Sequence, residues 1–146
     1  MELKPIELNL DKSKEIYSSD DCQTVLKTYD EYYSKIGYDS PWVGYFIARD
    51  NQIVGCCGFT EQPKEGKVEI AYWTFKENEG QGVASFSCKE LLSISQQFDP
   101  TIVITAKTAP DYNASTKILQ KNGFAFTGTV QDEEIGDAWL WTLLKK

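Results

Sequence analysis

The feature that most constrains the fold is the six-residue stretch 79–84 (EGQGVA), which joins a strand-like aromatic segment to an apolar helical one. The first turn of a helix has backbone N–H groups without intrahelical partners, and the helix dipole favours negative charge there. Gly80 and Gly82 have no Cβ atom, so a diphosphate can approach the main chain closely. Two glycines near a helix start are also typical of a plain turn, and the surrounding sequence has to decide between these interpretations.

The sequence before this loop predicts a helix followed by an antiparallel meander. Residues 21–36 repeat apolar side chains at three- and four-residue steps and indicate an amphipathic helix that ends at Gly37. Ser19 and Asp20 can cap its start. Strand-like runs at 42–48 and 53–59 are joined by a tight hairpin turn, and a third run at 68–75 alternates and is rich in aromatic residues. A short first strand is expected near the N-terminus.

The sequence after the loop predicts two further helices and three strands. Residues 84–98 place apolar side chains on one broad face of a helix, and 101–105 form a short apolar run typical of a central strand. A helix over 114–122 begins after Asp111 or Asn113, and the chain ends in strand-like runs at 124–130 and 138–144.

Length and composition favour one domain over residues 1–146. A chain of 146 residues with 41% hydrophobic content can bury one sizeable core. No apolar run approaches the roughly 20 residues that span a bilayer, and the first residues lack a signal-peptide core. Four cysteines without metal-type spacing predict small buried hydrophobes in a reducing compartment. We therefore expect a soluble, cytoplasmic protein without a membrane partner.

The charged side chains limit the partners, the metal ligands and the proton-transfer groups that this protein can use. The net charge is −7 with a single arginine, Arg49, which argues against a nucleic-acid partner and favours a neutral or cationic one. Acidic balance also serves solubility in small proteins. The sequence has no histidine, which removes the commonest general base and the commonest metal ligand. We expect no metal, and proton transfer through carboxylate, tyrosine, cysteine, water or backbone.

Two familiar phosphate-binding motifs do not match the loop. The motif GxxxxGK[ST] is absent, and GxGxxG is interrupted because Ser85 stands at the third glycine. No acidic residue closes the next strand at Thr105-Ala106-Lys107, where a dinucleotide fold would hold the ribose. The loop therefore predicts a diphosphate site outside a Rossmann fold.

The order of the expected elements, the loop 79–84 and the segment 113–124 (NASTKILQKNGF) resemble the GCN5-related N-acetyltransferase (GNAT) superfamily. The resemblance covers roughly residues 42–144. It is closest to the branch of ribosomal-protein N-terminal acetyltransferases, in which a Tyr-Trp pair precedes the loop as Tyr72-Trp73 does here. It implies an α/β fold, α+β in some schemes: one three-layer domain of the acyl-CoA N-acyltransferase type. Its mixed, mostly antiparallel sheet of six to seven strands would carry helices on both faces, with acetyl-CoA between splayed fourth and fifth strands.

The resemblance also implies residues that bind acetyl-CoA. Backbone around Thr74 would pair with the pantetheine amides. Asn113 would contact the pantetheine arm and could cap its helix at the same time. Ser115 could reach the cofactor too, although serine is common in a first helical turn without a ligand. The expected pyrophosphate cradle consists of Gly80, Gln81, Gly82, Val83 and Ala84.

Two residues depart from the family pattern. Glu79 stands where the loop usually begins with Arg or Gln. Because a carboxylate beside a diphosphate is unfavourable, we expect the Glu79 side chain to face solvent. Gln120 stands where many members have a tyrosine that is thought to protonate the leaving thiolate, and this leaves the general acid unassigned.

Acetyl transfer to an amine needs a neutral nucleophile, a donor to the developing oxyanion and a proton acceptor. A splayed strand supplies the backbone donor. Glu69 is the candidate base, on the strand face shared with Ala71 and Trp73, although an ion-paired or solvated carboxylate fits the sequence equally well. The acidic turn at 132–137 and the tyrosines of the first helix either frame the acceptor site or are simply solvated.

The expected function is N-acetyl transfer from acetyl-CoA to a primary amine, on a small molecule or a protein N-terminus, by direct attack in a ternary complex. The acceptor is expected to arrive as a cation, and a homodimer is compatible with this reading. Two alternatives remain, a non-catalytic acyl-CoA-binding or sensory module and a plain interaction domain. The motif does not name the acceptor, because variable loops build that pocket.

Overall fold

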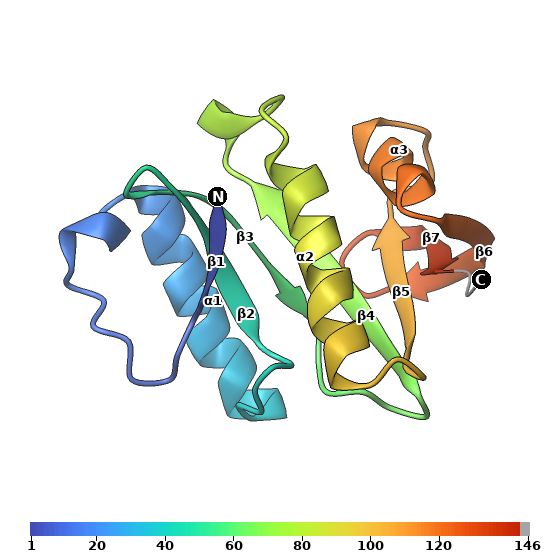
Figure 1. The fold of residues 1–146 in the computed structure, drawn as a ribbon, viewed down its shortest axis with the longest axis horizontal. Coiled ribbons are helices and arrows are strands. Elements are labelled where there is room, and N and C mark those ends of the chain that lie inside the picture. Colours follow the sequence, from blue (N-terminus) through green and yellow to red (C-terminus); the bar gives the residue numbers. More distant parts are fainter. Residues whose placement is uncertain (144–146) are drawn as a thin grey trace.

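The predicted strand and helix patterns assemble into one mixed sheet in a computed structural model that describes residues 1–143 (Figure 1). The strands lie in the spatial order β1-β2-β3-β4-β5-β7-β6, and only the β4–β5 pair is parallel. The strands are β1 (Glu2–Pro5), β2 (Gly44–Arg49), β3 (Gln52–Phe59), β4 (Lys67–Thr74), β5 (Val103–Thr108), β6 (Phe124–Asp132) and β7 (Gly136–Leu143). The helices are α1 (Asp20–Ile36), α2 (Val83–Phe98) and α3 (Ala114–Lys121), with 3-10 segments η1 (Glu15–Tyr17) and η2 (Lys76–Asn78).

The first helix has the ends that the sequence predicts. The Ser19 hydroxyl accepts a hydrogen bond from the Cys22 N–H at 3.1 Å and caps the start of α1. Gly37 takes a φ of 82° and ends the helix, with its N–H bonded to the Tyr33 carbonyl. The buried Tyr33 hydroxyl also accepts from the Gly44 N–H and donates to the Ile6 carbonyl, which ties α1 to the first two strands.

The meander β2–β3–β4 is built by two tight turns. Asp50 and Asn51 adopt φ values of 50° and 62°, as a two-residue hairpin turn requires. The second turn uses Glu65 and Gly66, which also have positive φ. These turns set the register that brings β4 to the middle of the sheet, between β3 and β5.

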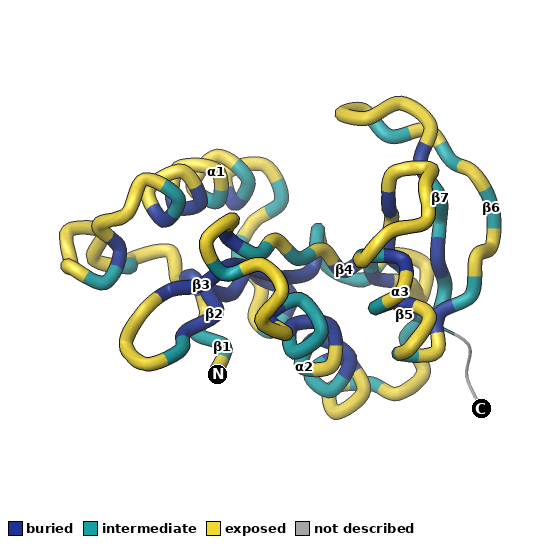
Figure 2. Tube along the Cα trace, turned by 90° about the horizontal axis from the view of Figure 1, so that it is seen from above, coloured by how far each residue is buried: buried dark blue, intermediate teal, exposed yellow. Residues whose placement is uncertain are grey.

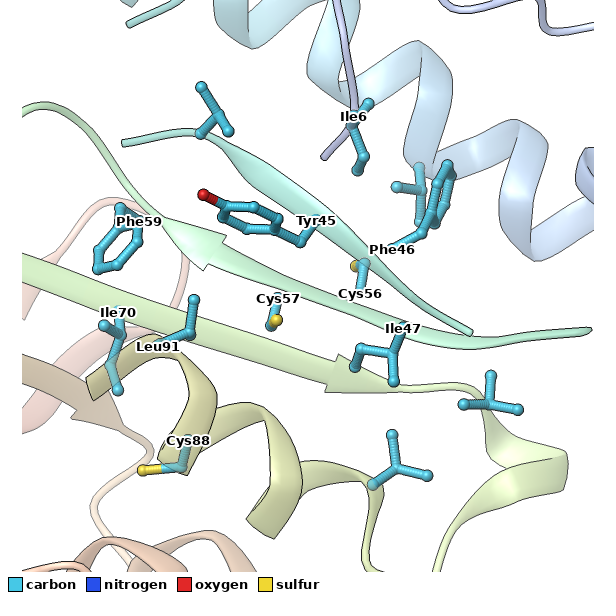
Figure 3. Packing of buried hydrophobic residues seen from close by; sticks show 14 of the residues in the cluster. Ile6, Tyr45, Phe46, Ile47, Cys56, Cys57, Phe59, Ile70, Cys88 and Leu91 are labelled. Carbon is cyan, nitrogen blue, oxygen red and sulfur yellow. The ribbon is translucent and has the colours of Figure 1, made fainter. Parts of the chain in front are cut away.

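Helices cover both faces of the sheet, which confirms the predicted fold class (Figure 2). The helix α1 lies on one face, while α2 packs against β3 and β4 on the other and contacts α3. Figure 3 shows the resulting layers of the core, with Ile6 and Phe46 toward α1 and with Leu91 and Cys88 on α2. All four cysteines are free and buried, as the sequence predicts.

The strand after α2 begins two residues later than the predicted 101–105. The Asp99 carboxylate accepts hydrogen bonds from both the N–H and the hydroxyl of Thr101, which holds the chain in a turn before β5 starts at Val103. The strand then continues to Thr108. At the C-terminus, β7 is described to Leu143, and Leu144, the predicted end of the last strand, lies outside the described residues.

Candidate active site

The strands β4 and β5 separate partway along their length. Their parallel ladder runs from Lys67 opposite Val103 to Ile70 opposite Ala106. Both strands continue beyond this point, β4 to Thr74 and β5 to Thr108, with no further pairing between them in the part of the chain that the structure describes. A gap therefore opens in the middle of the sheet, at the end where the loop 79–84 lies.

Hydrogen bonds to β3 show which backbone groups of β4 face this gap. The Glu69 carbonyl accepts from the Thr60 N–H at 2.9 Å, and the Phe75 N–H donates to the Val54 carbonyl at 3.0 Å. Backbone groups alternate sides along a strand, so the odd-numbered residues of β4 bond toward β3. The N–H and C=O groups of Tyr72 and Thr74 consequently point into the gap.

The glycine loop presents unpaired backbone donors. Gly80 and Gly82 have φ values of 77° and 81°, and a Cβ atom at either position would meet no other atom within 4 Å. The first helical hydrogen bond of α2 runs from the Phe86 N–H to the Gly82 carbonyl at 3.0 Å. Within residues 1–143, no hydrogen bond from the N–H groups of residues 80–85 is found. The loop and the first turn of α2 can therefore bind a diphosphate.

Two charged residues flank the loop. The guanidinium of Arg49, the chain's single arginine, donates a hydrogen bond to the Gln81 side-chain oxygen and so places a positive charge beside the cradle. The side chain of Glu79 is exposed, in agreement with the expectation that it faces solvent. No local pattern in the sequence predicts this place for Arg49, because β2 and the loop lie far apart in the chain.

The start of α3 adjoins the same gap. The Asn113 side-chain oxygen accepts from the N–H groups of Ser115 and Thr116 at 2.9 and 3.2 Å, which makes it the N-cap. The Tyr72 hydroxyl lies 3.5 Å from the Ser115 carbonyl and links β4 to α3, and burial raises the pKa of Tyr72 to about 12. Gln120 is exposed on α3 and lines a separate cavity of about 410 Å³.

A larger cavity of about 890 Å³ lies on the α1 face of the sheet. Glu69, Ala71 and Trp73 of β4 line it together, as their alternation predicts. Two of the three tyrosines of α1 and the acidic turn after β6 also reach it. The titratable and aromatic residues of its lining are Tyr29, Tyr32, Cys56, Phe59, Glu61, Glu69, Trp73, Lys107, Asp132, Glu133 and Glu134.

The polar centre of this cavity is an ion-paired triad. The Lys107 ammonium lies 3.2 Å from a Glu69 oxygen and 3.7 Å from an Asp132 oxygen, and all three side chains are between one quarter and one third exposed. Burial lowers the pKa of Lys107, but the two carboxylates outweigh burial and leave that pKa raised. The N–H of Glu134 and, more weakly, Lys107 hold the pKa of Asp132 below its usual value. Lys107 is therefore a fixed cation and Asp132 a fixed anion at neutral pH.

Aromatic side chains form the rest of the cavity wall. Gly44 makes room for the Tyr29 ring, since a Cβ at this position would lie 2.3 Å from that ring. Burial raises the pKa of Tyr29 well above its ordinary value, so its hydroxyl stays neutral. Trp73 is 44% exposed on the open part of β4. An aromatic wall with carboxylates suits an organic cation.

The structure places most of the predicted site residues around the gap between the central strands β4 and β5. Thr74, the loop 80–84 and Asn113 surround the gap, and Glu69 lies on the cavity side of the same strand. Sequence reasoning missed Lys107, which is the first residue of β5 beyond the ladder. The sequence signal for this residue is a single charge in an otherwise uncharged run. Lys107 stands two residues after Thr105, which pairs with Glu69.

The described part of the chain has no cluster of three or more metal-binding side chains of the usual kinds. Nor does any helix within residues 1–143 have the length and apolar character to cross a membrane.

Comparison with known proteins decides the family. The family model of the acetyltransferase (GNAT) domain matches residues 7–125. The chain belongs to the GNAT acetyltransferase family. It is 25% identical over 97 residues to the ribosomal-protein-serine acetyltransferase of Escherichia coli (strain K12), an alignment that covers 65% of this chain and 54% of that protein. This relative agrees with the resemblance to the ribosomal-protein branch.

Solved GNAT structures share the fold. A chimera of spermidine N-acetyltransferase SpeG from Vibrio cholerae and hSSAT has a TM-score of 0.70 at 17% identity, covering 98% of this chain and 95% of that one. The microcin C7 self-immunity acetyltransferase MccE, in complex with acetyl-CoA and AMP, has a TM-score of 0.64 at 17% identity, covering 86% and 71%. This GNAT chain spans 52–60% of the length of the curated relatives that it matches.

Proposed function

We propose that this chain is an acetyl-CoA-dependent N-acetyltransferase that acetylates a primary amine arriving as a cation, by direct attack in a ternary complex. The observation that carries the proposal is the juxtaposition on β4. The strand presents free backbone groups to a gap that leads to the glycine loop, and it presents Glu69 to an acidic, aromatic cavity.

The gap fits an acyl-CoA. Acetyl-CoA would supply an activated thioester. The N–H groups of residues 80–85 and the nearby Arg49 would bind its diphosphate. Because the loop follows the C-terminal end of β4, the backbone of Thr74 would meet the pantetheine arm before Tyr72 does. Asn113 uses its oxygen for capping, and its side-chain nitrogen is left to contact the arm.

The cavity fits the acceptor. Its lining has five carboxylates and one ammonium, an excess of negative charge that attracts a cationic amine. The spermidine N-acetyltransferase chimera among the structural neighbours is consistent with this reading. The acceptor would reach the thioester between Glu69 and Trp73, where the pairing of β4 with β5 ends at Ile70.

Two residues of β4 would then take different roles in the reaction. Glu69 accepts a proton from the bound ammonium, directly or through water, so that the neutral amine can attack the carbonyl carbon. The Tyr72 N–H donates to the carbonyl oxygen as negative charge develops there. The C–S bond would break as the new C–N bond forms, and the departing CoA thiolate would take up the second proton that the amine nitrogen loses. Tyr72, whose pKa is about 12, keeps its phenol protonated throughout.

We further propose a cytoplasmic location. The four buried free thiols suit a reducing compartment, and acetyl-CoA is available there.

Turnover with a panel of amines tests the proposal. The purified chain is incubated with acetyl-CoA and, separately, diamines, monoamines and N-terminal peptides. Thiol release is followed with a chromogenic reagent, and acetylated products are identified by mass spectrometry. We expect at least one amine to give an N-acetyl product in amounts equal to the thiol released.

Two controls separate the possible failures. Binding of acetyl-CoA without turnover on any amine would identify a non-catalytic acyl-CoA-binding module. The absence of acetyl-CoA binding by calorimetry would refute the cofactor site itself. A covalently acetylated enzyme detected by intact mass, formed before the amine is added, would contradict direct transfer.

A further inference from the structure

The Lys107 ammonium is a positive charge inside the cavity that is proposed to bind a cationic amine. It contacts Glu69 of β4 at 3.2 Å and Asp132 at the end of β6 at 3.7 Å. Three other carboxylates, Glu61, Glu133 and Glu134, line the same cavity without an ion pair within the described residues. Lys107, the only positively charged side chain of this lining among residues 1–143, therefore neutralises the two acids at its centre.

The position of the triad relates it to the reacting atoms. Glu69 lies in the last part of the β4–β5 ladder, opposite Thr105, and Lys107 follows where the two strands have begun to separate. The triad consequently stands at the mouth of the gap in which the thioester would lie. The acids without an ion pair come from other elements: Glu61 from the segment after β3, and Glu133 and Glu134 from the turn after β6.

An acidic cavity creates a conflict for amine acetylation. Carboxylates close to an ammonium favour its charged form, which raises the pKa of the bound amine, whereas only the neutral amine can attack. A fixed positive charge near the amine acts in the opposite direction. Lys107 remains protonated because Glu69 and Asp132 raise its pKa, so it can supply that charge and cannot serve as the base.

We propose that Lys107 is a positioning residue that controls the protonation of the bound acceptor: it neutralises Glu69 and Asp132 at the reacting end of the cavity, which weakens the hold on the acceptor's proton there. The remaining acids attract the cation, and the aromatic wall of Tyr29, Tyr32 and Trp73 contacts its carbon chain. The inference rests on the proposed function. Lys107 would weaken binding of the cationic acceptor and, in return, raise the rate at which the bound acceptor reacts.

The test compares the wild type with Lys107→Met and Lys107→Arg, using 1,4-diaminobutane as the cationic probe and 1,4-butanediol as its uncharged analogue. Affinity for each probe is measured by calorimetry at pH 7, and kcat is measured against pH with any accepted amine. We expect Lys107→Met to bind the diamine about threefold more tightly, since partly exposed charges interact modestly. Its kcat at neutral pH should fall about threefold, and the acid limb of the kcat profile should move up by about half a pH unit. Diol binding should not change.

Three variants besides Lys107→Met sharpen this comparison. Lys107→Arg keeps the charge and should restore the wild-type profile. Lys89→Met, on the exposed surface of α2, makes the same change in net charge and should behave as the wild type. Asp132→Asn leaves the Lys107 charge less neutralised and should give the opposite result, with weaker diamine binding and an acid limb at lower pH. Asp132→Asn also covers the case in which Lys107→Met does not fold.

Two outcomes would overturn the inference. If Lys107→Met binds the diamine as weakly as the wild type or more weakly, with an unmoved acid limb, Lys107 only holds the turn after β6 in place. The same conclusion follows if Asp132→Asn changes the profile in the same direction as Lys107→Met. If the wild type acetylates no amine while Lys107→Met still binds the diamine more tightly, the charge balance at Lys107 is supported and the proposed function fails.

Discussion

The substitution Gly82→Val tests whether the left-handed conformation of the loop is what binds acetyl-CoA. Gly82 has a φ of 81°, and no atom within 4 Å would obstruct a side chain, so the cost of valine is conformational rather than steric crowding. A β-branched residue in this region is strained by about 2 kcal/mol. Because no described hydrogen bond holds the N–H groups of residues 80–85, the free loop can relax out of this conformation and must return to it on binding.

The magnitude follows from this cost. A binding penalty of about 2 kcal/mol corresponds to a roughly 30-fold weaker dissociation constant. At an acetyl-CoA concentration one hundred times the wild-type constant, the ligand stabilises the wild type by about 2.7 kcal/mol and the variant by about 0.9 kcal/mol. At about 4 °C per kcal/mol, the ligand-induced rise in melting temperature falls from roughly 10 °C to roughly 4 °C.

Gly37→Val provides the control, at a second glycine with positive φ but with a ψ of 173° in place of 9°. Gly37 has nearly the same φ, 82°, with open space around its Cβ position, but it ends α1 away from the loop. Differential scanning fluorimetry with and without acetyl-CoA should show a lower melting temperature for Gly37→Val and the full ligand-induced rise. A full rise in Gly82→Val, or an equal loss in both variants, would refute the argument that the loop conformation forms the diphosphate site.

Four further predictions concern the base, the loop charge, the core and alkaline pH. Glu69→Gln should lower kcat roughly a hundredfold, the contribution of a positioned base, with acetyl-CoA affinity unchanged; a normal rate with every accepted amine would make Glu69 structural. Glu79→Gln should bind acetyl-CoA equally or up to about 1 kcal/mol more tightly in calorimetry, and a large loss would show that the carboxylate holds the loop. Tyr33→Phe should lower the free energy of unfolding by about 2 to 4 kcal/mol in urea, because it leaves buried backbone partners of the hydroxyl unpaired. Burial raises the pKa of both Tyr45 and Cys56 to about 12, so stability should be complete below pH 9 and should decline as pH rises toward 12; a flat circular-dichroism melting profile over that range would contradict this.

Local patterns in the sequence determined most of the fold. The helix over 21–36, the turn at Asp50-Asn51 and the caps at Ser19 and Asn113 depend on backbone conformation and neighbouring side chains, and all of them are found in the structure. The start of β5 was wrong by two residues. The reason is equally local, since the Asp99 side chain competes with strand formation at Thr101.

Local sequence patterns also predicted part of the candidate site. The glycine loop was visible in the sequence because a positive φ and a free helix start are properties of consecutive residues. The alternation of Glu69, Ala71 and Trp73 likewise placed them on one face of a strand, and they line one cavity.

Only the tertiary structure decided which charges meet. Lys107 joins Glu69 through the parallel pairing of β4 with β5, and it joins Asp132 because β7 inserts between β5 and β6 and carries the acidic turn over the cavity. The tertiary fold likewise brings Arg49, the last residue of β2, into contact with Gln81 of the loop. Charge interactions depend on distance in space, whereas the sequence records only separation along the chain. The order of the strands in the sheet determines which residues that are distant in the sequence become neighbours in space. The packing of both sheet faces against their helices fixes that order.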